Sequence, residues 1–232
     1  MRFHYFQHVP FEPPVNIEKW IREKGFDISG THFYRGEPFP DFSRFDVLVV
    51  MGGPMGVYDD REYPFLAREK VYIENALKLG KKVIGVCLGA QMLADVLGAK
   101  VYKNRYKEIG WFPVYKTDEA EEGTAFQNLP KEFIAFHWHG DTFDLPAGAT
   151  RLAYNEATEN QAFQYQDKAL ALQFHLETSP QSAKELIENS KEELQEKGKY
   201  IQSPEEMLSK EEYFKMIEKY LYSVLDNFLL KR

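Results

Sequence analysis

Short apolar runs alternate with helical patterns through the first half of the chain, and this alternation limits the possible folds most strongly. Each run is bounded by Gly, Pro or Asp. The predicted strands span residues 2–7, 26–33, 47–50 and 83–86, and the predicted helices span residues 16–24 and 64–79. Because strands separated by helices form βαβ units, these strands are expected to lie parallel in one sheet. Asn16 is a possible N-cap of the first helix.

The pattern changes in the second half, where short predicted strands follow one another closely. They span residues 100–102, 111–115, 134–136, 151–154, 162–165 and 169–174. We expect hairpins here, and therefore a mixed sheet. The expected fold class is α/β: a three-layer, open, mixed but mostly parallel sheet with helices on both faces, of the flavodoxin-like kind.

The chain becomes helical and charged after residue 179. The predicted capping serines are Ser179, Ser203 and Ser209, the last two with Glu three residues on. Gly198 is expected to end the first of these helices. The last helix carries one apolar stripe, which indicates packing on the domain or, alternatively, docking of another chain. We therefore expect a domain of residues 1–180 and a C-terminal helical extension, residues 181–232, packed on it.

Charge and cysteine content exclude several classes of protein. The 232 residues carry a formal net charge of -7, whereas a nucleic-acid partner requires clustered Lys and Arg. A single cysteine excludes an internal disulfide. The N-terminus has no signal-peptide pattern, and no stretch approaches the roughly 18 apolar residues of a membrane span. We expect a cytoplasmic protein that binds neither nucleic acid nor membrane.

A cysteine stands where a predicted buried strand turns directly into a helix. Gly85 and Gly89 flank Cys87 two positions to each side, a spacing that permits a tight turn and presents a nucleophile above the sheet edge. The positive end of the helix would stabilise a thiolate there. We interpret Cys87 as a nucleophile, with an ordinary buried cysteine as the alternative.

A nucleophilic thiol needs a general base, and the base needs a group that fixes its tautomer. The last predicted strand leads into His175-Leu176-Glu177. Side chains two apart in extended chain point the same way, so the carboxylate of Glu177 can hold the imidazole of His175. Parallel strands place this pair and Cys87 at the same sheet edge.

A glycine-rich loop follows the buried strand at residues 47–50. Gly52-Gly53-Pro54 can point a backbone N–H into a pocket, and a tetrahedral intermediate needs at least two such donors. The candidate oxyanion donors are the N–H groups of Gly53 and Leu88. A plain glycine turn is the alternative. Phosphate binding is disfavoured because there is neither a Walker lysine nor a G-x-G-x-x-G motif.

These segments together resemble the class I glutamine amidotransferases, most closely the glutaminase domain of GMP synthetase and its stand-alone relatives. The resemblance covers about residues 45–180. The matching motifs, in the family's order, are Gly52-Gly53-Pro54, Gly85-Val86-Cys87-Leu88-Gly89-Ala90-Gln91, Trp138-His139-Gly140-Asp141 and His175-Leu176-Glu177. Their joint occurrence is far more specific than any one motif.

The resemblance implies an enzyme that hydrolyses the side-chain amide of glutamine to glutamate and ammonia. Cys87 would attack the amide and form a glutamyl thioester. His175 would protonate the departing ammonia and then activate water, while Glu177 orients His175. No cofactor and no metal is implied.

The resemblance also implies a binding site for the amino acid. Gln91 would contact the bound glutamine, and the backbone around Gly140 and Asp141 would hold its amino-acid end. The 232 residues contain no ATP-dependent synthetase domain. An acceptor of the ammonia, if there is one, is therefore expected on a separate synthetase subunit.

Three alternatives stay open. The same three side chains would cleave any γ-glutamyl amide that the pocket admits, so a γ-glutamyl peptide or γ-glutamyl amine hydrolase is the runner-up. A non-catalytic binding module of the same fold is the second alternative. His137 and His139 suggest a metal site only weakly, because two histidines two apart lack a nearby third ligand in the sequence.

Overall fold

The computed structural model describes residues 1–230, and a nine-stranded mixed sheet forms its centre. Five strands pair in parallel: β1 (Arg2–Gln7), β2 (Asp27–His32), β3 (Val47–Val50), β4 (Lys82–Val86) and β9 (Ala169–Leu172). Four join by antiparallel pairing: β5 (Val101–Lys116), β6 (Glu132–Phe143), β7 (Thr150–Tyr154) and β8 (Ala162–Tyr165). The order across the sheet is β2-β1-β3-β4-β9-β8-β7-β5-β6. This confirms the expected open, mixed and mostly parallel sheet.

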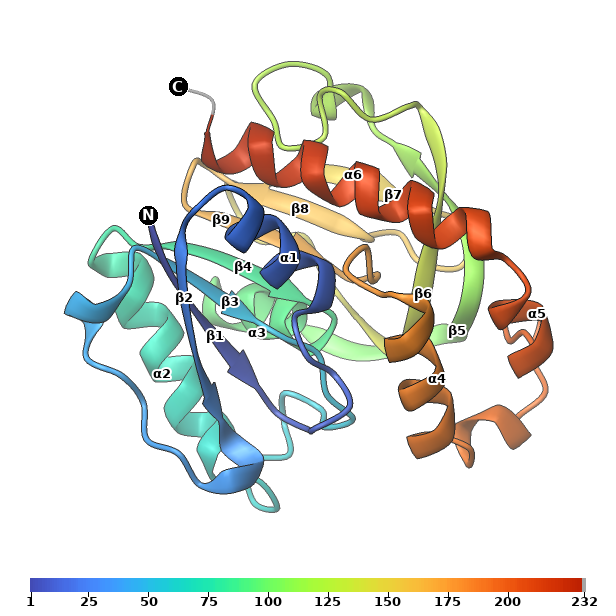
Figure 1. Cartoon of the computed structure of the whole chain (residues 1–232), viewed down its shortest axis with the longest axis horizontal. Helices are drawn as coiled ribbons and strands as arrows, with labels where there is room; N and C mark the ends of the chain where they lie inside the picture. The colour runs from blue at the N-terminus through green and yellow to red at the C-terminus, as the bar shows by residue number, and fades with distance from the viewer. Residues whose placement is uncertain (231–232) are drawn as a thin grey trace.

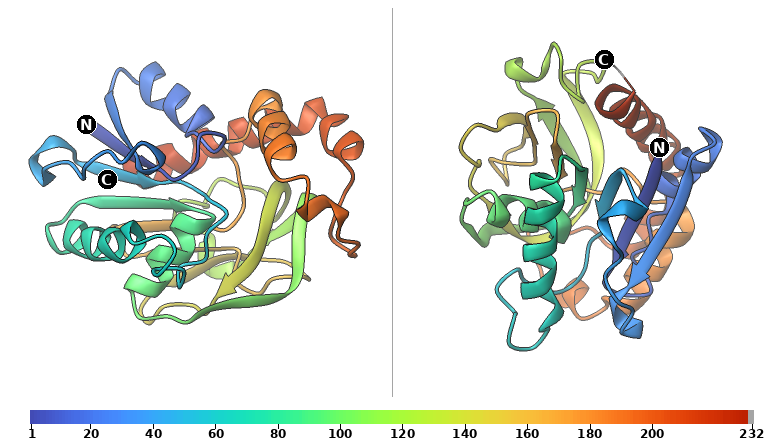
Figure 2. Two further views of the ribbon diagram at one scale, coloured as in Figure 1. Left: turned by 90° about the horizontal axis from the view of Figure 1, so that it is seen from below. Right: turned by 90° about the vertical axis from the view of Figure 1, so that its left-hand side faces the viewer.

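Helices cover both faces of the sheet (Figures 1 and 2). They are α1 (Val15–Glu23), α2 (Phe65–Lys78), α3 (Leu88–Val96), α4 (Pro180–Asn189), α5 (Pro204–Leu208) and α6 (Glu211–Leu229). Side chains of α2 and α3 belong to one core cluster, and those of α1 and α6 belong to the other. Because both faces are covered, all four residues of β3 are buried, as is typical of a central parallel strand. The three predicted layers are confirmed.

The last helix packs its apolar stripe on the sheet. Ile217, Leu221 and Val224 are at most 1% exposed, and the indole of Trp20 on α1 donates to Asp226 Oδ1 over 3.0 Å. The apolar stripe is therefore buried in the core cluster that also contains α1. No helix within residues 1–230 is both long and apolar enough to cross a membrane. The boundary at residue 180 between a domain and a C-terminal extension stays a prediction. The last two residues of the predicted extension, 231–232, lie outside the described residues.

Two of the three predicted capping serines cap helices. Ser179 accepts a hydrogen bond from the N–H of Ser182, and Ser203 forms a capping box with Glu206. The prediction for Ser209 is wrong, because its hydroxyl donates to the carbonyl of Glu206 and it ends α5 instead of starting α6. The hydrogen bond from the Ser209 hydroxyl to the nearby backbone takes the place of the expected capping bond at the start of α6.

Two predicted helix boundaries are also wrong. Asn16 lies inside α1, and its amide donates to the carbonyl of Thr178 over 3.4 Å instead of capping the helix. α4 ends at Asn189 rather than at Gly198. The residues between them include a short separate turn, Glu193–Gln195, which a salt bridge ties to β5.

The predicted short strands 100–102 and 111–115 form one long strand, β5, with a register shift between Lys103 and Glu108. Likewise, β6 continues well past the predicted end at residue 136. Residues 103–110 were not assigned to a strand from the sequence. Their backbone nevertheless continues the antiparallel ladder with β6, which places the Trp138–Asp141 motif on a strand.

The carboxyl ends of the parallel strands meet at one edge of the sheet. Val50 pairs with Gly85, and Val86 pairs with Leu172, so β3, β4 and β9 end side by side. The N–H of Cys87 continues this pairing by donating to the carbonyl of Leu172 over 2.8 Å. Open α/β sheets bind their ligands at this edge.

Candidate active site

Cys87 occupies a strained turn between β4 and α3. Its φ of 52° and ψ of -107° are unusual for a residue with a side chain. A Cβ on Gly85 would lie 2.3 Å from the carbonyl oxygen of Gly89, and a Cβ on Gly89 would lie 2.1 Å from that of Val50. Both positions therefore require glycine, and the predicted strand-to-helix turn at Cys87 is confirmed.

His175 and Glu177 follow β9 and form a buried pair. The N–H of His175 donates to the carbonyl of Phe136 over 2.8 Å, which fixes the backbone. Nδ1 of His175 lies 2.7 Å from Oε1 of Glu177, so both predicted side chains share one face as expected. Nε2 of His175 has no hydrogen-bond partner within residues 1–230, yet the thiol of Cys87 is close enough to interact with the ring. The structure thus brings all three residues together.

The protonation of this group differs from the expectation of a thiolate. Burial raises the pKa of the Cys87 thiol, and it outweighs the lowering by His175 and by the N–H of Leu88. Burial also opposes the charged form of His175, but Glu177 and Cys87 together hold its pKa well above the usual value. The helix start therefore acts on the thiol as predicted, through the N–H of Leu88, but burial opposes it and is the larger effect.

The Gly52-Gly53 loop packs directly against this pair. A Cβ on Gly52 would lie 2.1 Å from Oε2 of Glu12 and 3.3 Å from Cε1 of His175. A Cβ on Gly53 would lie 3.2 Å from the side chain of Leu88. Within residues 1–230, the N–H groups of Gly53 and Leu88 donate to no backbone or side-chain oxygen. Residues Gly53 and Leu88 are therefore neighbours, and neither N–H is committed to an oxygen of the described residues.

A cavity of about 660 Å³ opens over the thiol. Its wall includes Cys87, Gly53, Gln91, Gly140 and Asp141, so the predicted substrate-binding residues surround the same space. The amide of Gln91 donates to Gln173 Oε1 over 3.2 Å, which holds this side chain at the wall.

The sequence that forms this site matches a known protein family. Residues 16–193 match the model of the family described as glutamine amidotransferase class-I. The chain belongs to the class-I glutamine amidotransferase family.

Relatives of this chain support the family assignment, and two of them match nearly its whole length. The glutamine amidotransferase-like protein YfeJ of Salmonella typhimurium is 34% identical, over 99% of this chain and 98% of that protein. The crystal structure of a glutamine amidotransferase from Thermotoga maritima superimposes with a TM-score of 0.90 and 37% identity, covering 100% of this chain and 99% of that one. A GMP synthase of Thermosipho melanesiensis is 28% identical over 75% of this chain, which spans only 32% of that enzyme.

Several residues around the cavity were not predicted from the sequence. Glu12 lines it from the loop after β1, where burial raises the pKa of its carboxyl to about 7. Tyr58 donates its hydroxyl to the carboxylate of Asp141. Leu186 and Glu193 line it from the C-terminal segment. Single residues of these types form no sequence motif, so their place at the cavity follows only from the folded structure.

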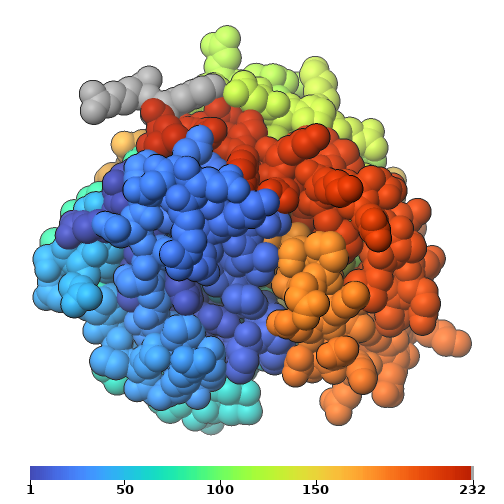
Figure 3. Space-filling model, in the orientation of Figure 1, coloured from blue at the N-terminus to red at the C-terminus, as the bar shows by residue number. Residues whose placement is uncertain are grey.

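The C-terminal segment forms one wall of the cavity. The indole of Trp138 donates to Oε1 of Glu193 over 3.1 Å, and Lys107 lies 3.2 Å from Glu193 and 2.7 Å from Glu196. In Figure 3 the orange segment around α4 lies directly against the blue N-terminal part of the chain. This wall comes from residues that were expected only to pack on the domain.

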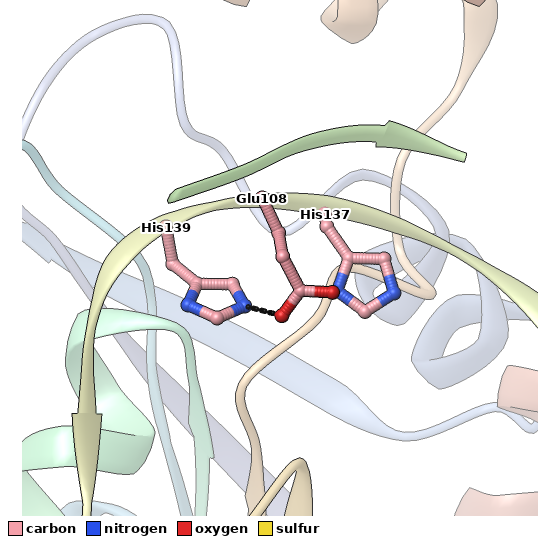
Figure 4. A group of neighbouring side chains, drawn as sticks. All are labelled: Glu108, His137 and His139. Carbon is pink, nitrogen blue, oxygen red and sulfur yellow. Dashed lines mark ion pairs between the residues drawn. The ribbon is translucent and has the colours of Figure 1, made fainter. Parts of the chain in front are cut away.

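A second buried group lies on β5 and β6 (Figure 4). The ligand atoms of Glu108, His137 and His139 lie within 4.8 Å of one another, and Nε2 of His139 is 3.1 Å from the carboxylate. The further donors to Glu108, at 2.6–2.7 Å, are Asn155, Thr158 and Gln161. A carboxylate has about four lone-pair sites; Asn155, Thr158 and Gln161 occupy three of them, whereas Nε2 of His139 lies at ion-pair distance without forming a hydrogen bond. The group therefore fits a hydrogen-bond network better than a metal site.

Proposed function

We propose that this protein hydrolyses a γ-glutamyl amide, with glutamine as the reference substrate, through a thioester on Cys87. The observation that carries the proposal is the meeting of Cys87 with the His175–Glu177 pair at the wall of a cavity. Gly53 and Gln91 line the same cavity as Cys87, so the nucleophile, an oxyanion donor and a polar binding group surround one space, with the base directly behind the thiol. These are the parts that acyl transfer requires.

Each step assigns the protons explicitly. As the sulfur of Cys87 attacks the amide carbon, its proton passes to Nε2 of His175, and Glu177 stabilises the imidazolium. The N–H groups of Gly53 and Leu88 hold the negative oxygen of the tetrahedral intermediate. The tetrahedral intermediate then collapses, and its C–N bond breaks as His175 gives its proton to the leaving nitrogen. Ammonia departs, and the glutamyl thioester on Cys87 remains.

Water completes the cycle. His175 takes a proton from a water molecule that attacks the thioester carbon, and then returns the proton to the sulfur as the C–S bond breaks. The products are glutamate and the original thiol. Glu177, bound to Nδ1 of His175, favours the imidazolium that forms whenever Nε2 takes up a proton in either half of the reaction.

The size of the cavity favours a second candidate substrate. A volume of about 660 Å³ lies within the range of about 300–1,000 Å³ that holds drug-sized ligands, so there is room for more than glutamine. A γ-glutamyl peptide or a γ-glutamyl amine is therefore the second candidate.

A separate synthetase subunit is a further proposal. One relative, in Methanococcus aeolicus, is named as a single subunit of a glutamine-hydrolysing GMP synthase, and it is 28% identical over 54% of this chain. In that protein the name itself indicates a division between polypeptides. We propose the same division for this chain if its ammonia is transferred to an acceptor.

The test is incubation of the protein with glutamine and with γ-glutamyl dipeptides and amines, measuring glutamate and ammonia. We expect turnover that is lost in Cys87→Ala, and intact-mass analysis after a glutamine-analogue electrophile should show one label on the single cysteine. A strong preference for peptides or amines would replace glutamine by the second candidate. Full turnover by Cys87→Ala would overturn the chemistry, and a wild-type protein inert to every compound would favour a binding module.

A further inference from the structure

A second buried histidine–glutamate pair lies beside the glycine loop and has no role in the chemistry proposed above. His8 follows β1, Glu69 lies on α2, and neither side chain has any exposed surface. Nε2 of His8 is 3.0 Å from Oε2 and 3.1 Å from Oε1 of Glu69. Nδ1 of His8 lies 2.9 Å from the carbonyl oxygen of Gly52.

Both ring nitrogens of His8 face atoms that can only accept hydrogen bonds. The carboxylate of Glu69 accepts at Nε2, and the carbonyl of Gly52 accepts at Nδ1. A neutral imidazole has only one N–H, so both bonds form only when the ring is protonated on both nitrogens. Burial alone would lower the pKa of His8, but Glu69 and the Gly52 carbonyl outweigh burial and raise it. His8 is thus held as a charged double donor.

The bond to Gly52 has a direct consequence for Gly53. The carbonyl of Gly52 and the N–H of Gly53 belong to the same planar peptide unit, and in a trans peptide these two groups point in opposite directions. A donor that fixes the carbonyl therefore also fixes the direction of the N–H. Two adjacent glycines resist rotation of this unit less than any other pair of residues. The orientation must therefore come from an outside contact.

We propose that the His8–Glu69 pair is a positioning element that orients the Gly53 N–H as an oxyanion donor. The inference rests on the proposed function, because it takes Gly53 as the donor. Glu69 keeps the ring of His8 charged and in place, His8 holds the Gly52 carbonyl, and Gly53 lines the cavity, where its N–H has no oxygen partner within residues 1–230. The donor is thereby oriented by the chain's own residues.

Two substitutions at the same position separate this role from a general effect on folding. In His8→Asn the amide nitrogen replaces Nδ1 and can still donate to Gly52, whereas in His8→Gln the amide replaces Nε2 and cannot. We expect kcat of His8→Gln to fall about 10- to 100-fold, less than the roughly 10²–10³ that complete loss of an oxyanion donor costs, because the Gly53 N–H is misoriented but still present. His8→Asn should recover most of that loss. KM should change little in both, because the donor acts on the transition state.

Alkylation of Cys87 by iodoacetamide provides the control. This reaction needs the thiol and His175 but no oxyanion donor, so its rate in His8→Gln should match that of the wild type. Ile73→Val on α2 is the matched variant for stability, since Ile73 is buried and does not contact the loop through a hydrogen bond. It should keep the wild-type kcat. Equal kcat in His8→Gln and wild type, or a parallel fall of kcat and alkylation rate, would overturn the proposal.

A crystal structure of His8→Gln tests the same idea without turnover. We expect the Gly52–Gly53 peptide to be rotated or disordered in this variant. An unchanged peptide would refute the positioning role even if the protein proved inactive on every γ-glutamyl compound. Inactivity of the wild type would instead refute the proposed function, so the two failures are distinguishable.

Discussion

Two buried histidine–glutamate pairs contact the Gly52-Gly53 loop, and they use their ring nitrogens differently. Glu177 binds Nδ1 of His175 and leaves Nε2 without a partner beside the thiol. In His8 both nitrogens are engaged, one by Glu69 and the other by Gly52. Residue types and burial are the same in both pairs. The comparison shows that a histidine–glutamate pair alone does not identify the proposed base. The proposed base is identified by a ring nitrogen that has no hydrogen-bond partner and lies next to the proposed nucleophile.

The pair formed by His139 and Glu108 extends the comparison. Its imidazole Nδ1 lies 3.0 Å from the carbonyl oxygen of Asp141, and its Nε2 faces Glu108. It therefore resembles His8 in facing oxygen atoms on both sides. We expect substitutions in this pair to change stability, and substitutions in the His175 pair to change turnover.

Glu177→Gln should give the largest effect. The amide cannot stabilise the imidazolium and can select the wrong tautomer of His175, so kcat should fall by about 10³–10⁴, as for the carboxylate of other catalytic triads. The free energy of unfolding should change far less. Steady-state kinetics and urea unfolding measure the two quantities, and a loss of activity below tenfold would contradict the assignment.

Glu108→Gln should have the opposite profile. The carboxylate is buried and accepts bonds from several donors, so its loss should lower the free energy of unfolding by about 3 kcal/mol, the scale of a broken buried ion pair. Activity of the folded fraction should stay within a few-fold of wild type. Urea unfolding at pH 7 measures the first effect. A stable but inactive variant would place Glu108 in the chemistry after all.

The same variant has a pH dependence with a defined sign. Burial opposes ionisation of Glu108, but His137, His139 and Thr158 outweigh burial and hold its pKa well below the usual value. A carboxyl whose pKa is lowered by folding adds stability above its unfolded pKa and loses it as the pH falls. The stability difference between wild type and Glu108→Gln should therefore shrink below about pH 4.5. A difference that grows with acid would be inconsistent with the lowered pKa.

Glu12→Gln should give the smallest effect, a shift in the pH dependence of the thiol. The pKa of Glu12 is raised to about 7 by burial and by Glu177 and Glu193, against the lowering by His175 and His8. Ionised Glu12 also raises the pKa of Cys87. Removing the charge should move the alkylation profile of Cys87 to lower pH by less than about one unit. It should also remove any inflection near pH 7, and an unchanged profile would show that Glu12 is not coupled to the thiol.

Local patterns predicted the parts of the site that local structure determines. The turn at Cys87 depends on Gly85 and Gly89, and the His175–Glu177 pair depends on a spacing of two in extended chain, so both follow from neighbouring residues. The strands at residues 2–7 and 47–50 were likewise predicted with their observed bounds. Short apolar runs flanked by turn residues have few alternatives.

Contacts between distant segments could not be predicted in this way. His8 and Glu69 are 61 positions apart, and their meeting depends on how α2 packs on the sheet. The two predicted strands, 100–102 and 111–115, join into the continuous β5 through its ladder with β6, which is a contact between distant segments. The burial that raises the pKa of Cys87 is also a property of the closed fold, which explains why the helix start alone predicted the opposite direction.

The reacting groups and one wall of the cavity come from different parts of the chain. The proposed nucleophile, the proposed base and the glycine loop all come from the edge of the sheet, whereas Leu186 and Glu193 come from the segment that begins with α4. Changes in that segment can therefore alter which molecule fits above the thiol without disturbing the strands that carry the reacting groups. A family built in this way can acquire new substrate preferences by remodelling its tail while its chemistry stays the same.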